Sequence, residues 1–174
     1  QALAQLARIA ALGSTDNAAR TIELFNQAIE VADQLALSRN VSERHIAKEL
    51  LVDCHLAVAE QIAGGRWQRK PTVVPQWIGR ASAFAEEMIE NDGGSLELRL
   101  RVAVHALAAL ANFQPMPNPS GWIQEAQETA NQLLQKTDDQ LQNQSVRWQL
   151  GLAYFHALHI AHVRGDAAIA HKYG

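Results

Sequence analysis

Histidine has the widest choice of chemistry among the side chains of this 174-residue sequence, because it can bind a metal or transfer a proton. Three histidines recur at intervals of 50 and 51 residues in similar local sequences, namely His55, His105 and His156. His159 and His162 follow the last of them, and residues three apart share one face of a helix. The spacing allows two interpretations, a metal site and a row of packing or groove residues along a repeat.

A zinc site needs three or four converging donors, and the candidates besides His159 and His162 are Asp53 and Cys54. Equivalent residues of successive repeats are separated by about one repeat, which is too far for a chelate. The packing or groove interpretation is therefore preferred. We expect no metal and no cofactor.

The sequence motifs of common enzymes are absent. It has no glycine-rich phosphate loop, no His-Glu-x-x-His and no Gly-x-Ser-x-Gly. Cys54 and His55 are adjacent, but neighbours on a helix point about 100° apart and do not face each other as a thiol–imidazole pair. The single cysteine also excludes a disulfide framework. We expect that the protein is not an enzyme.

The overall charge identifies no partner. A balance of 15 basic and 18 acidic residues gives a net charge of −3, which argues against a general nucleic-acid surface, and no apolar run is long enough for a membrane span. A local exception is the basic loop that contains Arg66, Trp67, Arg69 and Lys70. This loop could meet an acidic partner or stack on a base, but the preferred interpretation is a solvated loop with Trp67 folded back on the helices.

Helices must position these residues. Hydrophobic residues make up 48% of the chain and aromatic residues only 6%, because most of the apolar residues are alanine and leucine, both strong helix formers. Glycine, proline and capping residues divide the chain into segments of roughly 12 to 24 residues with apolar residues at helical spacing. Pro75 suits the first turn of one such segment. The sequence predicts an all-α protein with seven helices and the start of an eighth.

The helices form an internal repeat. Segments 28–35, 81–88 and 126–133 share the pattern Ala, three residues, Ala, two polar residues, then Leu or Met. A large residue precedes each pattern and is expected to fill the space between units, namely Phe25, Trp77 and Trp122. Histidine-containing helices alternate with these alanine helices. We predict one domain, an α-α superhelix of about three and a half two-helix repeats, with units 1–38, 41–91, 95–136 and 141–174.

This pattern resembles the tetratricopeptide (TPR) superfamily. The matching segments are Tyr154-x-x-Ala157-Leu158 through Gly165-Asp166 to Ala170, and Phe25-x-x-Ala28-Ile29-Glu30. The units exceed the usual length of roughly 34 residues, the glycine of the first helix is missing and no proline closes a unit. These features look more like the long-helix TPR variants of bacterial signalling ATPases and transcription activators. HEAT-type and other α-α repeats stay open.

The resemblance implies a bacterial, cytoplasmic interaction scaffold or sensor within a larger signalling or regulatory protein. Its concave groove would hold a peptide, a partner domain or an adjacent domain of the same chain, without direct binding to nucleic acid or membrane. The first helix of each unit would line that groove, which makes four residues candidate contacts: His105, Phe155, His159 and His162.

Two alternatives to the scaffold stay open. One is a domain that binds a small molecule or metal through the histidine rows. The other is self-assembly through an apolar repeat end at Ala167 to Ala170. The sequence begins with Gln1 and stops shortly after a new helical pattern starts, so we expect a fragment of a longer chain.

Overall fold

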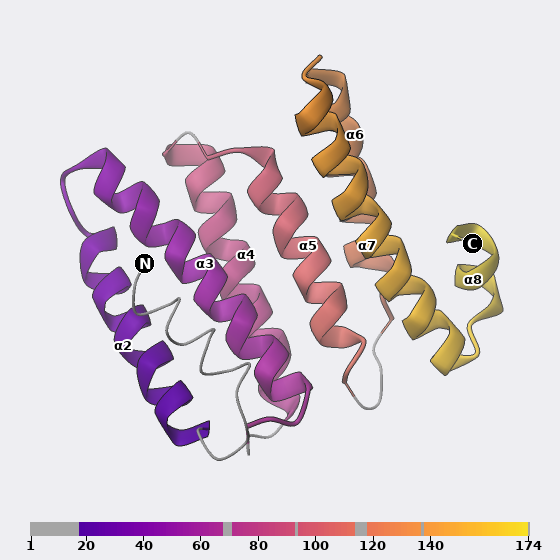
Figure 1. Cartoon of the computed structure of the whole chain (residues 1–174), viewed down its shortest axis with the longest axis horizontal. Coiled ribbons are helices and arrows are strands. Elements are labelled where there is room, and N and C mark those ends of the chain that lie inside the picture. Colours follow the sequence, from indigo (N-terminus) through magenta and orange to yellow (C-terminus); the bar gives the residue numbers. More distant parts are fainter. Residues whose placement is uncertain (1–17, 68–70, 93, 114–117, 137, 174) are drawn as a thin grey trace. The chain divides into compact units, whose positions relative to one another are not determined.

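The computed structural model describes residues 18–67, 71–92, 94–113, 118–136 and 138–173, which are almost entirely helical (Figure 1). The helices are α2 (Ala18–Ala36), α3 (Val41–Ala63), α4 (Val74–Asn91), α5 (Leu96–Leu110), α6 (Ser120–Lys136), α7 (Gln140–Arg164) and α8 (Ala167–Tyr173), with a short 3₁₀ turn, η2 (Pro71–Val73), before α4. No strand occurs within the described ranges, so the all-α prediction is confirmed. Residues 1–17, the beginning of the predicted unit 1–38, lie outside them.

The chain divides into two compact units, residues 1–94 and 95–174. In the first unit, α3 packs against both α2 and α4. In the second unit, α5 packs against α6 and α7, α6 also packs against α7, and α7 packs against α8. Each helix therefore contacts helices that are near it in the sequence. None of those described is long and apolar enough to cross a membrane.

The helix ends lie where the capping residues predicted them. Asn40 caps α3, since its side chain accepts a hydrogen bond from the Ser42 amide at 3.0 Å. Asp139 caps α7 in the same way through the amides of Leu141 and Gln142. Pro75 lies in the first turn of α4, where its missing N–H has no helical partner to lose. Gly165 ends α7 with φ 69°, a left-handed conformation that favours glycine.

Small side chains dominate the contact faces of the alanine helices. All six alanines of the repeated pattern are buried: Ala28, Ala32, Ala81, Ala85, Ala126 and Ala130. Side chains of this size let neighbouring helices approach closely. Of the three large residues that precede the pattern, Phe25 is buried, whereas Trp77 and Trp122 are only half-buried. The isoleucines that follow these two tryptophans, Ile78 and Ile123, are buried.

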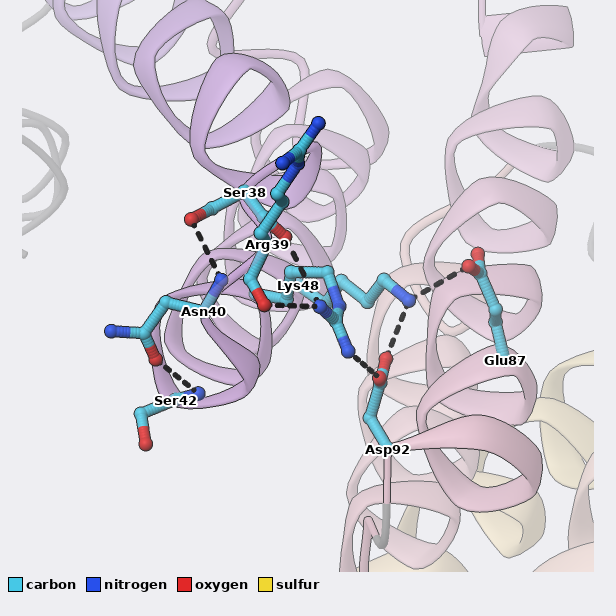
Figure 2. A network of polar contacts seen from close by, with 8 residues as sticks. Ser38, Arg39, Asn40, Ser42, Lys48, Glu87 and Asp92 are labelled. Atoms are coloured by element: carbon cyan, nitrogen blue, oxygen red, sulfur yellow. Dashed lines mark hydrogen bonds and ion pairs between the residues drawn. The ribbon is translucent and has the colours of Figure 1, made fainter.

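A network of charged side chains joins the start of α3 to the end of α4 (Figure 2). The buried Lys48 amine lies 2.7 Å from Glu87 Oε1 and 2.5 Å from Asp92 Oδ2. Arg44 Nη2 approaches the other Asp92 oxygen at 3.3 Å. Burial by itself lowers the pKa of Lys48, but hydrogen bonds to Asp92 and Glu87 outweigh it, and the pKa is raised. Lys48 therefore stays charged over the neutral range, and the network fixes one end of the α3–α4 pair.

Candidate ligand-binding groove

The first unit contains a hollow of about 630 Å³ between α2 and α4, with α3 contributing a buried histidine. On α2, the residues that follow the buried alanines, Ile29 and Asp33, line the hollow. On α4, the residues that precede the buried alanines, Arg80 and Phe84, line it. Neighbours on a helix point about 100° apart, so a residue beside a buried stripe points sideways. Since α2 and α4 both pack on α3, the residues beside their buried stripes face each other across a groove.

The interior of the groove is aromatic. His55, from α3, is 3% exposed, and its ring centroid lies 5.1 Å from that of Trp77 and 5.6 Å from that of Phe84. Its Nδ1 lies 2.7 Å from the Leu51 carbonyl oxygen. A carbonyl can only accept, so Nδ1 carries the proton of the neutral ring and Nε2 is left as an acceptor. The groove therefore combines three rings with one hydrogen-bond acceptor.

The rim of the groove is charged asymmetrically. Glu30 and Asp33 are exposed on the α2 side, where Asn26 and Gln34 complete the rim. Arg80 is exposed on the α4 side, and its guanidinium carbon lies 5.8 Å from the centroid of the Trp77 ring. This distance is within the range of a cation–π contact. One lip of the groove is thus acidic, and the other carries a cation held over an aromatic face.

The environment keeps His55 neutral. Burial lowers the pKa of its imidazole below 6.5, and the nearby Arg80 acts in the same direction. The hydrogen bond to Leu51 and the charge of Asp33 oppose this change without reversing it. At neutral pH the histidine therefore presents an uncharged acceptor in the groove.

The four predicted groove residues lie in the second unit, and none of them lines this hollow. His105 is half-buried on α5, whereas Phe155, His159 and His162 are exposed on α7. That the first helices of the units form a binding face stays a prediction.

Trp67 of the predicted basic loop is a packing residue. It is 5% exposed, and its ring meets the buried Phe25 edge-on, with centroids 5.7 Å apart. This is the folded-back arrangement that the sequence favoured over a stacking platform. Arg66 is exposed, while Arg69 and Lys70 lie outside the described residues.

The described residues contain no cluster of metal-binding side chains that would support the metal alternative. Within the described ranges, no group of three or more His, Cys, Asp or Glu side chains could hold a metal ion. Cys54 is buried in α3, and His159 and His162 are exposed on α7. At the predicted apolar end, Ile169 is buried on α8, whereas Ala167 and Ala168 are exposed.

His55 is one of the recurring histidines that the sequence analysis interpreted as packing or groove residues. The groove residues of α2 and α4 were missed because the family resemblance assigned the binding face to the other set of helices. A signal was present in the sequence. Trp77, Arg80 and Phe84 recur at spacings of three and four, which places them on one face of α4. Ile29 and Asp33 do the same on α2. Each set lies directly beside the alanine stripe.

Comparison with known proteins identifies no relative of this chain. No protein-family model matches this chain, and neither does any curated protein or solved structure.

Proposed function

We propose that this chain is a helical interaction module of TPR-like two-helix units that binds a segment of a partner protein in the α2–α4 groove. It carries out no reaction of its own. The observation that supports this function is the aromatic groove itself, with a buried acceptor inside it and an acidic lip above it. Its volume of about 630 Å³ suits one or two side chains of a bound segment.

Three features of the groove favour the same kind of ligand side chain. The faces of Trp77 and Phe84 attract cations, the carboxylates of Glu30 and Asp33 attract positive charge, and Nε2 of His55 is left to accept a hydrogen bond. Lysine and arginine combine an apolar stem with a cationic donor group. The bound segment therefore carries a lysine or arginine next to an apolar residue.

Arg80 supplies an internal precedent for this mode of binding. Its guanidinium already lies over the Trp77 ring, so this aromatic face accepts a cation. Arg80 also gives the α4 lip a positive charge that suits a backbone carbonyl or a carboxylate of the bound segment. A segment with a basic side chain on the α2 side and an acceptor on the α4 side matches both lips.

The helical walls exist before the ligand arrives. A side chain that enters a preformed groove loses its own freedom, but the protein does not have to order a loop around it. This property suits a scaffold or sensor region of a larger signalling or regulatory protein, which is the role that the TPR resemblance implies.

Capped dipeptides offer a direct test of the groove and of its ligand class. We would titrate N-acetyl-Phe-Arg-amide and its neutral counterpart N-acetyl-Phe-citrulline-amide into ¹⁵N- and ¹³C-labelled protein. We expect the Phe-Arg probe to shift the indole signal of Trp77 and the ring signals of His55, and to bind more tightly than the citrulline probe. Replacing both Glu30→Gln and Asp33→Asn should weaken it roughly twofold to thirtyfold, since exposed ion pairs contribute about 0.2–1 kcal/mol each.

Glu90→Gln provides the matched control, because Glu90 is an exposed carboxylate of α4 that does not line the groove. If the arginine and citrulline probes bind equally well, the groove is still a binding site, but the prediction that its ligand is basic is wrong. No shift of Trp77 or His55 at millimolar concentrations of either probe would reject the groove as a binding site.

A further inference from the structure

Helix α7 carries a row of large exposed side chains along its whole length. Leu141 is 77% exposed, Trp148 71% and Phe155 65%, and His162 and Val163 are also exposed near the C-terminal end. Leu141, Trp148, Phe155 and His162 follow one another at intervals of seven residues. Exposed aromatic residues grouped on one face usually mark a surface that another element covers.

A spacing of seven residues identifies what kind of element fits. Seven residues are nearly two turns of an α-helix, so the four side chains form a stripe that drifts by about 20° per step. A second helix that crosses at a small angle follows such a stripe along its full length. The occupant that matches this row is therefore another helix.

The row is complementary to itself when a second copy of α7 runs in the opposite direction. Its midpoint falls between Gly151 and Leu152, because Trp148 and Phe155 are equally far from that point. Around a two-fold axis there, Trp148 of each copy faces Phe155 of the other. Leu141 likewise faces His162 of the other copy. Gly151, where an added Cβ would have no atom within 4 Å beyond the neighbouring backbone of its own helix, leaves room at the crossing.

Charge favours the antiparallel direction over the parallel one. Asp138 and Asp139 precede the first turn of α7, while His162 and Arg164 lie in its last turn. An antiparallel pair brings the acidic end of each helix to the basic end of the other, whereas a parallel pair brings like charges together.

We propose that two copies of this chain associate through an antiparallel α7–α7 pair centred between Gly151 and Leu152. This interface uses Phe155, a residue also predicted to contact a partner, in a symmetric contact between copies. It is independent of the α2–α4 groove. Aromatic side chains bury about 150–250 Å² each, so four of them with their neighbours supply an interface near the lower end of the specific range.

Sedimentation of the full chain over a range of concentrations tests the association. We expect a reversible monomer–dimer equilibrium, and we expect Trp148→Ala with Phe155→Ala to raise the dissociation constant at least tenfold. Leu37→Ala is the matched control, because Leu37 is an exposed apolar side chain outside α7 and its removal should leave the equilibrium unchanged. Gly151→Leu should also weaken the dimer, whereas Gly79→Ala, another open helical glycine, should not.

Cross-linking tests the direction of the pair. Gln144 and His159 are exposed and lie at equal distances from the proposed axis. Equimolar Gln144→Cys and His159→Cys proteins, treated with a short bis-maleimide, should give mainly the mixed dimer because Cys54 is buried. A monomer at all concentrations, a dimer that survives the double alanine change, or cross-links only between identical variants would overturn the proposal.

Discussion

The amine of Lys48 lies 2.5 Å from Oδ2 of Asp92, although 44 residues separate them in the sequence. This pair connects α3 to the residue that follows α4. The carboxylate of Glu87 is a second partner of the same amine. Both side chains of the pair are largely shielded from solvent. The contact therefore acts as a fixed point between two helices, which a flexible surface ion pair would not provide.

Acid should weaken this fixed point. The hydrogen bond from Lys48 lowers the pKa of Asp92 below 3.8. Its stabilising contribution is complete above pH 3.8 and is lost as the pH falls toward the folded pKa, because the unfolded chain takes up the proton first. We expect Asp92→Asn to be less stable than wild type at pH 7, with the difference shrinking as the pH falls below 3.8. Urea unfolding at several pH values measures this difference, and a constant gap would contradict it.

His55 should report the charges on both lips of the groove. Burial lowers its pKa below 6.5, so its contribution to stability is complete above pH 6.5 and decreases as the pH falls toward the folded pKa. Arg80→Gln removes a neighbouring positive charge and should raise the pKa of His55. Asp33→Asn removes the opposing negative charge and should lower it. Titration of the ring signals by NMR measures both changes, and shifts of the same sign would contradict this arrangement.

Trp67 should contribute strongly to stability although it lies outside every helix. Its ring is buried against Phe25, so Trp67→Ala should reduce the free energy of unfolding by about 3–5 kcal/mol. Leu37→Ala, at a position 85% exposed, should change it by less than about 0.5 kcal/mol. Chemical denaturation measures both variants. A small effect at Trp67 would mean that the ring does not pack as described.

Two glycines should respond in opposite directions to alanine. A Cβ on Gly94 would lie 2.9 Å from the backbone carbon of Met88, where the chain turns back on the end of α4 and the Gly94 amide donates to the Met88 carbonyl at 2.8 Å. Gly94→Ala should therefore destabilise the protein by about 1–3 kcal/mol, because the backbone has to move. An added Cβ on Gly79 has no atom within 4 Å beyond the backbone of its own helix, so Gly79→Ala should stabilise the protein by about 0.5–1 kcal/mol. Thermal unfolding of both variants measures this contrast.

Local sequence predicted the helices well because their signals act over a few residues. Asn40, Pro75 and Gly165 end or start helices through their own backbone and side-chain geometry, which needs no distant partner. The alanine pattern likewise identified the contact faces. The burial of Trp67 depends on Phe25, more than 40 residues away, so the sequence could offer it only as one of two interpretations.

The groove depended on packing that periodicity does not specify. The side chains of Asp33 and Arg80 share a hollow only because α2 and α4 both pack on α3. Helical spacing shows which residues of one helix share a face, but it does not show which face of another helix lies opposite. The same limit applied to Trp77, where the sequence identified a space-filling residue and the structure has a half-exposed groove wall.

The packing of α3 between its two sequence neighbours has a consequence for how the chain is made. All of these contacts join helices that are consecutive in the chain, so only short loops have to close before the helices meet. Local contacts of this kind favour rapid folding. During synthesis, α2 and α3 can pack together while α4 is still being added. The groove then lacks the side that α4 forms. Within the first unit, the α2–α4 groove is therefore complete only when Trp77 and Phe84 of α4 reach His55.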